Sequence, residues 1–167
     1  MAYQIIGNVI INQPIDETST TNVDIELGTI IQARDPDYGV GEFIYLLGAS
    51  STAVGSWVTY NADNFGRTLL AANAIGPVAV AMSANSSTSN KGWYQISGKA
   101  VGACLTQFAD NGNVYATATA GSVDDASVIG DAVFNAKGAS TTVVDSGVAD
   151  FEISRPSCPN RTAPVTG

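Results

Sequence analysis

The sequence predicts an all-β protein, a small barrel or sandwich built of hairpins with little helix. Three observations support this prediction. The runs of Val, Ile, Thr and aromatic residues are short. They are separated by Gly, Asn, Asp and Ser, and few stretches show the periodicity of a helix. Many short strands with closely spaced turn residues favour a barrel or sandwich over alternating strands and helices.

Ten strands are expected, each from a short run of β-branched and aromatic residues. They lie near residues 5–11, 25–33, 42–47, 56–60, 68–72, 78–82, 93–97, 100–105, 114–119 and 148–154. Only residues 69–74 and 124–134 could form helix, and Gly130 interrupts the second stretch, which is also rich in Val and Ile. We therefore expect at most one or two short helical turns.

Turn residues connect these strands. Asn111-Gly112 suits a type I′ turn and predicts a hairpin between residues 104–108 and 114–117. Gly98-Lys99 is interpreted as a second turn, which would reverse the chain between residues 93–97 and 100–101. Residues 61–66 can close a longer hairpin after the strand that contains Trp57.

The two ends differ from the middle in composition. Residues 1–34 alternate apolar bursts with a polar run at 16–22, which predicts an extended N-terminal arm with the first strands. Residues 35–154 form the predicted barrel or sandwich domain. Residues 155–167 hold three prolines and predict an irregular C-terminal tail.

Composition excludes several classes of protein. The chain has 167 residues, of which 45% are hydrophobic and 13% charged, so it can bury a core and is not disordered. The net charge is −8, and the seven Lys and Arg residues are scattered, so nucleic acid and anionic membranes are not expected partners. The N-terminus lacks the features of a signal peptide, and no apolar run reaches 18 residues, which predicts a soluble protein made in the cytoplasm.

Catalytic chemistry is not expected. The chain has no His, which removes the commonest general base and most metal and nucleophile pairs. Nucleotide-binding and hydrolase motifs are absent, and no catalytic residue, cofactor or metal site is predicted. Asn and Asp clusters at 61–64 and 110–113 do not match a calcium loop and are interpreted as turns. Cys104 and Cys158 are expected to be free, packed thiols.

Two aromatic pairs are the remaining candidates for a site. Trp57 and Tyr60 lie on one predicted strand, and Trp93 and Tyr94 lie on another. Alternation along a strand places neighbouring residues on opposite faces, so one ring of each pair should be in the core. The other could anchor an interface or stack on a sugar.

The stretch from Gly55 to Leu105 resembles the decoration (cement) proteins and other small structural proteins of tailed-phage heads. It contains Gly-Ser-Trp-Val-Thr-Tyr, then Ile-Gly-Pro-Val-Ala-Val-Ala-Met-Ser, then Gly92-Trp-Tyr-Gln-Ile-Ser-Gly98. The resemblance covers about a third of the chain and assigns no functional residue. It implies a β-rich subunit, often a homotrimer, on the outer face of the phage head.

In that family role the subunit bridges neighbouring major capsid proteins and stabilises the expanded shell. The expected partners are therefore the major capsid protein and further copies of this chain, and the expected location is the virion surface. We expect the N-terminal segment or the proline-rich tail to pair with a neighbour's sheet edge. The candidate interface residues are Tyr3, Ile5, Ile6, Val9, Ile10, Ile11, Trp57 and Trp93.

Other interpretations stay open on the sequence. The main alternative is a head-fibre, tail or host-attachment protein that binds carbohydrate through exposed aromatic rings. A tail-tube or baseplate component would form rings or tubes. A small glycosidase would need a pair of carboxylates, for which Glu42 and Glu152 are the candidates.

Overall fold

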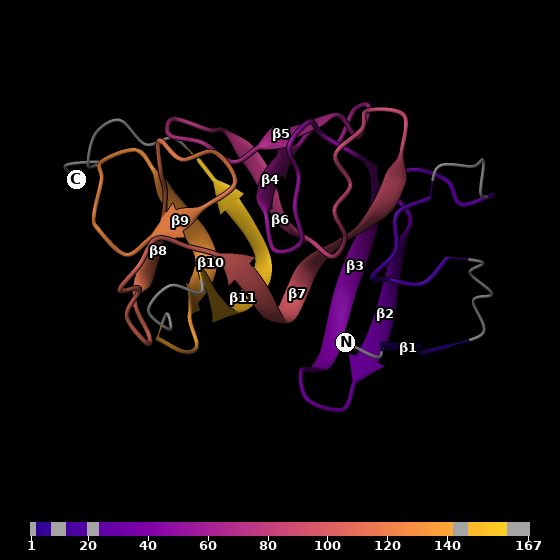
Figure 1. The fold of residues 1–167 in the computed structure, drawn as a ribbon, viewed down its shortest axis with the longest axis horizontal. Coiled ribbons are helices and arrows are strands. Elements are labelled where there is room, and N and C mark those ends of the chain that lie inside the picture. Colours follow the sequence, from indigo (N-terminus) through magenta and orange to yellow (C-terminus); the bar gives the residue numbers. More distant parts are fainter. Residues whose placement is uncertain (1–2, 8–12, 20–23, 142–146, 160–167) are drawn as a thin grey trace, which may run out of the picture.

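A computed structural model describes residues 3–7, 13–19, 24–141 and 147–159. The protein is all-β, as predicted, and the described residues contain no helix. Figure 1 shows β2 and β3 at one end of the molecule, β8, β9 and β10 at the other, and β4, β5 and β6 between them. The strands are β1 (Gln4–Ile5), β2 (Ile30–Asp35), β3 (Gly39–Leu47), β4 (Trp57–Tyr60), β5 (Arg67–Leu69), β6 (Gly76–Ala81), β7 (Lys91–Ala103), β8 (Asn113–Ala116), β9 (Val123–Asp124), β10 (Ala132–Gly138) and β11 (Val148–Cys158).

All strands join one open antiparallel sheet. Its order is β1-β2-β3-β7-β6-β11-β10-β8-β9, and the β4–β5 hairpin branches from β6. Residues 61–66 close that hairpin as predicted: Asn61 N–H donates to Gly66 O at 2.7 Å. The two end strands, β1 and β9, have only two residues each. Such short edges offer little backbone for uncontrolled pairing with other chains.

The long strand β7 connects the two ends of the sheet. Its first half pairs with β3 and β6, and its second half pairs with β11 from Ser97 to Ala103. Gly98, with φ of +100°, lies where the partner changes. The predicted turn at Gly98-Lys99 is therefore wrong: the glycine bends a continuous strand, because residues 97–103 continue in register with β11 instead of folding back.

Strand alternation divides the core into three clusters. On β6, Val78 and Val80 enter the Trp57 cluster, whereas Ala79 and Ala81 enter the Tyr94 cluster on the opposite face. The strands β4 and β6 are thus buried on both faces. The third, the Phe43 cluster, covers the other face of β3 and β7. Its buried members are Ile15, Ile31, Ala33, Phe43, Tyr45, Met82 and Trp93.

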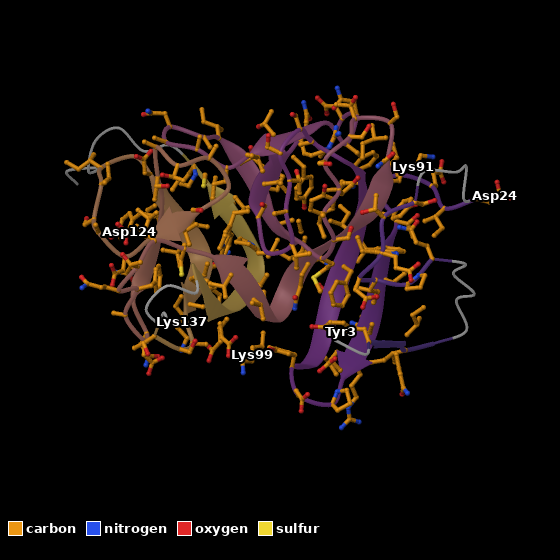
Figure 2. All side chains as sticks on the ribbon, in the orientation of Figure 1. Tyr3, Asp24, Lys91, Lys99, Asp124 and Lys137 are labelled. Carbon is orange, nitrogen blue, oxygen red and sulfur yellow. The ribbon has the colours of Figure 1, made fainter. Side chains whose placement is uncertain are left out.

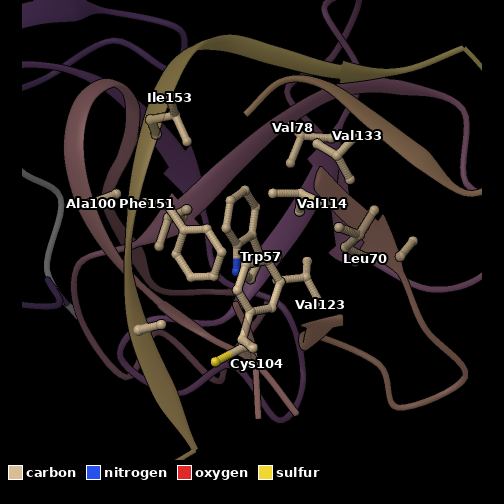
Figure 3. Packing of buried hydrophobic residues seen from close by; sticks show 14 of the residues in the cluster. Trp57, Leu70, Val78, Ala100, Cys104, Val114, Val123, Val133, Phe151 and Ile153 are labelled. Atoms are coloured by element: carbon tan, nitrogen blue, oxygen red, sulfur yellow. The ribbon is translucent and has the colours of Figure 1, made fainter. Parts of the chain in front are cut away.

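The Trp57 cluster is the largest of the three and lies between β4–β6 and the β7–β11–β10–β8 part of the sheet. The Trp57 and Phe151 rings meet edge to face with centroids 5.0 Å apart, and Phe108 contacts Phe151 in the same way at 4.9 Å. Figure 3 shows the indole among Phe151, Val114 and Val123. Gly102 makes room for it, since a Cβ there would lie 2.6 Å from Trp57 Nε1.

The described part of the N-terminal segment packs on this chain's own sheet. Tyr45 Oη donates to Gln13 Oε1 at 2.5 Å, and Gln13 Nε2 donates to the carbonyl oxygens of Glu17 and Lys91. Gln4 and Ile5 pair with β2, and the Tyr3 ring meets Phe43 at 4.9 Å. Residues 3–5 therefore do not extend away as an arm, because the edge of β2 and the Phe43 cluster hold them.

The predicted hairpin between residues 104–108 and 114–117 is wrong. Asn111-Gly112 forms a turn, in which Gly112 N–H donates to Ala109 O, but β8 pairs with β9 and β10 and not with residues 104–108. Residues 124–134 form β9, a loop and the start of β10 where helix was considered.

The predicted domain boundaries also cut through regular elements. The β2–β3 hairpin crosses the boundary at residue 34, since Arg34 pairs with Val40. Strand β11 continues to Cys158 through the predicted irregular tail. Pro156 is accepted there because the strand bulges at Arg155, whose φ is +49°.

Candidate interaction surface

A hydrogen bond joins the β5–β6 loop to the β9–β10 loop, and both loops carry exposed apolar side chains. Asp131 fixes this junction: its Oδ1 accepts from Asn73 N–H at 2.5 Å, and its backbone oxygen accepts from Ala116 N–H at 2.8 Å. Around the junction, Ile75 is 70% exposed, Val128 49%, Ile129 78% and Phe134 44%. We call these four residues the Ile129 patch.

The Ile129 patch holds a large share of the exposed apolar residues. Four of the nine large hydrophobic residues that are exposed in the described part of the chain belong to it. Single exposed apolar residues are normal, but a group of this kind marks an interaction surface more often.

Strand register connects Phe134 to the rest of the patch. Phe134 lies opposite Ser157 on β11, and Ser157 lies opposite Pro77 on β6. The pairing of Thr59 with Val78 places Tyr60 opposite Pro77, so these residues lie in one cross-strand row over β10, β11, β6 and β4. At the Tyr60 end this row packs against the Tyr94 cluster. Tyr60 is partly buried; burial raises the pKa of its hydroxyl, and Arg155 partly offsets this.

An open groove of about 750 Å³ adjoins the patch. The β4–β5 hairpin forms one side, with Tyr60 and Arg67, and the start of β6 forms the other, with Ile75 and Pro77. Ile75 therefore belongs to both the groove and the patch. The wall mixes polar and apolar side chains, which is the usual composition of a binding site.

The outer face of β7, β11 and β10 carries paired charges. Lys99 Nζ lies 2.9 Å from Asp150, Lys137 Nζ lies 3.0 Å from Glu152, and Arg155 lies 3.2 Å from Glu42. Figure 2 shows Lys99 and Lys137 along one side of the molecule, with Asp24 and Asp124 at opposite ends. This face is thus locally neutral.

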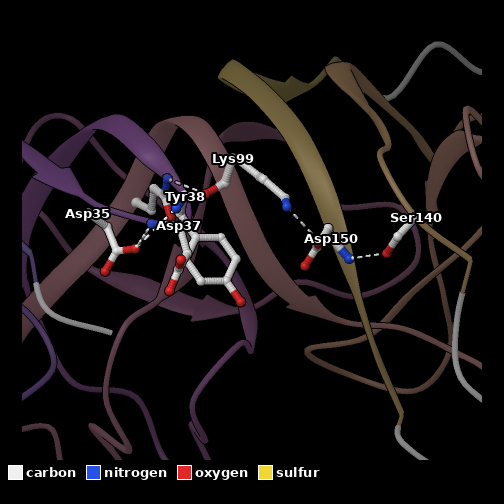
Figure 4. A network of polar contacts seen from close by, with 7 residues as sticks. Asp35, Asp37, Tyr38, Lys99, Ser140 and Asp150 are labelled. Carbon is white, nitrogen blue, oxygen red and sulfur yellow. Dashed lines mark hydrogen bonds and ion pairs between the residues drawn. The ribbon is translucent and has the colours of Figure 1, made fainter.

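A polar network extends the neutral face toward the β2–β3 turn. Lys99 reaches Asp150 beside the Tyr38 ring, and Ser140 Oγ accepts from Asp150 N–H at 2.9 Å (Figure 4). Asp35 Oδ1 accepts from the backbone of Asp37 and Tyr38 and so shapes the turn. The hydrogen bond to Asp150 raises the pKa of Lys99, which keeps its positive charge.

Among the described residues, no three His, Cys, Asp or Glu side chains come together to hold a metal ion. The glycosidase candidates Glu42 and Glu152 are both occupied in ion pairs. Cys104 and Cys158 are free and buried, as predicted, and burial raises the pKa of Cys158 to about 11.

The predicted interface residues are only partly accessible. Trp57 and Trp93 are fully buried, so the prediction that these rings contact a partner is wrong for this fold: β4, β3 and β7 have both faces covered. Tyr3 and Ile5 pack on the Phe43 cluster, and burial raises the pKa of Tyr3 to about 12. Ile6 is exposed. Residues Val9, Ile10 and Ile11 lie outside the described residues.

Sequence reasoning missed the Ile129 patch. Ile75 and Ile129 lie in loops 54 residues apart, and their proximity depends on the contact between Asn73 and Asp131. The one available signal was the presence of large apolar residues in stretches that contain turn residues, such as Val128-Ile129-Gly130.

Comparisons of the chain with protein-family models, curated proteins and solved structures gave no match. No helix among the described residues has the length and apolar character needed to cross a membrane.

Proposed function

We propose that the protein is a non-enzymatic virion component, a decoration protein that binds the outer face of a phage head and bridges neighbouring major capsid proteins. The observation that carries the proposal is the Ile129 patch, which holds four of the nine large apolar residues that are exposed in the described part of the chain. Apolar side chains at the centre of an interface supply most of its binding free energy.

Two further features support a role in adhesion. Phe134, the member of the patch that lies on a strand, is held by β10, which pairs with β8 on one side and β11 on the other. The charged face of β7, β11 and β10 is neutralised within the chain, so it does not attract a highly charged partner such as DNA. Binding only to the expanded shell would stabilise that state through differential affinity.

The test is cosedimentation of the purified protein with expanded, undecorated phage heads and with unexpanded proheads. Saturable binding to expanded heads alone supports the proposal and gives the copy number. Absence of binding to both particles would contradict it and favour a tail, fibre or host-attachment component.

A variant pair tests whether the patch makes the contact. We expect Phe134→Asp to weaken binding by at least about tenfold, because it places a charge at an apolar contact. Ile30→Asp is the matched control: both side chains are 44% exposed on strands, and Ile30 lies on β2 at the other end of the molecule. Equal losses in the two variants would contradict the assignment of the patch.

A further inference from the structure

Arg67 is an unusual cation in this chain because its charge is partly buried without a counter-ion. Its Nε and Nη2 atoms are buried and have no hydrogen-bond partner among the described residues. The ion pairs of the described chain involve Lys99, Lys137 and Arg155 instead. Burial lowers the pKa of Arg67, and the nearby Tyr94 side chain partly offsets this. The guanidinium is thus partly buried and interacts with the Tyr94 hydroxyl, but it has no carboxylate partner among the described residues, so an acidic partner could add a charge-assisted hydrogen bond.

The position of Arg67 supplies a site for such a partner. Arg67 lines the groove beside Tyr60, its neighbour across the β4–β5 pair. Two Asn side chains of the hairpin also line the groove, and their amide nitrogens are hydrogen-bond donors. Asn61 Oδ1 accepts from Asp63 N–H at 2.9 Å, and Asn64 Oδ1 accepts from Gly66 N–H at 2.8 Å.

These turn hydrogen bonds fix the two amide oxygens and leave the nitrogens available. In the described part of the chain, neither Asn61 Nδ2 nor Asn64 Nδ2 has a hydrogen-bond partner. The groove thus combines a guanidinium with two amide donors. A ligand rich in acceptors and negatively charged matches this set best, and a carboxylate forms strong, charge-assisted hydrogen bonds with guanidinium.

We propose that the groove binds a carboxylate carried by an acidic peptide segment of the partner protein, with Arg67 as its counter-ion. The inference rests on the proposed function, since it concerns the same surface and names the chemistry of the partner there. A peptide is favoured over an acidic sugar because Ile75 and Pro77 form an apolar wall that continues into the Ile129 patch. A segment with a Glu or Asp beside an apolar residue would contact both.

The experiment uses the isotopically labelled full chain and two blocked peptides, acetyl-Leu-Glu-Leu-amide and acetyl-Leu-Gln-Leu-amide, with glucuronate as the sugar probe. We expect the Glu peptide to shift the NMR signals of the Arg67 side chain and Ile75, and to bind about tenfold more tightly than the Gln peptide. Equal binding of the two peptides, or shifts confined to other strands, would overturn the proposal. Binding of glucuronate without the Glu peptide would overturn the peptide assignment.

Arg67→Met provides a second measurement. It should remove the preference for Glu over Gln without lowering Tm, because it replaces a partly buried charge that has no carboxylate partner by an apolar side chain of similar length. Arg155→Met is the control: Arg155 is exposed, already binds Glu42 and lies near Tyr60, and its loss should leave the preference intact. The wild-type comparison of the two peptides stands even where a variant fails to fold.

The two proposals fail separately. Cosedimentation with heads but no Glu preference would contradict the groove assignment alone. A clear Glu preference without cosedimentation would contradict the decoration role and leave the groove assignment in place.

Discussion

Replacing Gly98 by Ala should disrupt the bend of β7 severely. Gly98 has φ of +100°, a conformation that costs a residue with a side chain about 1–3 kcal/mol. An added Cβ would also lie 2.6 Å from Val40 O and 3.0 Å from Gly41 Cα, both backbone atoms that no rotamer change can move. Overpacking of this kind costs about 1–3 kcal/mol more. We therefore expect a total destabilisation of about 2–6 kcal/mol.

Gly39→Ala separates the two contributions. Gly39 also has a positive φ, +75°, but nothing lies within 4 Å of the position that an added Cβ would take, so only the conformational cost of about 1 kcal/mol applies. Urea unfolding followed by tryptophan fluorescence gives the free energy of unfolding of each variant. Both Gly→Ala substitutions reduce the entropy of the unfolded chain by the same amount, so this effect cancels when the two variants are compared. Equal destabilisation by the two substitutions would refute the close approach of β7 and β3 at this bend.

Three further predictions concern the core, the thiols and the surface. Tyr45→Phe should destabilise the protein by about 1–3 kcal/mol, because it leaves the buried Gln13 oxygen without its donor; urea unfolding measures this. Burial raises the pKa of Cys158 to about 11, so as the pH rises this thiol loses its proton in the unfolded chain before it does so in the folded protein. The free energy of unfolding should therefore fall between about pH 9 and 11, and Cys158→Ala should show a smaller fall over the same range. A double-mutant cycle on Lys137 and Glu152 should give a coupling of at most about 1 kcal/mol, since both side chains are exposed.

The sequence predicted the strands whose composition matches their environment. The runs that became β3, β4 and β6 are rich in Val, Ile and aromatic residues, and these strands are buried on both faces. The hairpin at residues 61–66 was also predictable, because Asn61 and Asn64 form local hydrogen bonds with the turn backbone.

Other features depended on contacts distant in sequence. A glycine with positive φ serves a turn and a strand bend equally well, so Gly98 could be interpreted only once its pairing with β11 was known. Strand β10 was missed because Phe134 and Asn135 form a bulge, which interrupts the alternation of a regular strand. Alternation placed Trp93 and Tyr94 on opposite faces correctly, but it cannot show that both faces are covered.

The groove and patch were beyond sequence reasoning for a related physical reason. Arg67 looked like one of seven scattered cations, and its burial follows from the packing of the β4–β5 hairpin near Tyr94. Secondary-structure propensity predicts the backbone conformation of such a residue. It does not predict how far the side chain is buried away from water, which determines its pKa.

The position of β11 has a consequence for the order of events during biosynthesis. This late strand pairs with β7, β10 and β6, and its Phe151 and Ile153 complete the packing around Trp57. A ribosome-bound chain that has not yet exposed residue 158 lacks the strand that joins these three neighbours. We therefore expect this half of the molecule to fold only after nearly the whole described chain has emerged, at a rate limited by long-range strand pairing, and to need protection from aggregation until then.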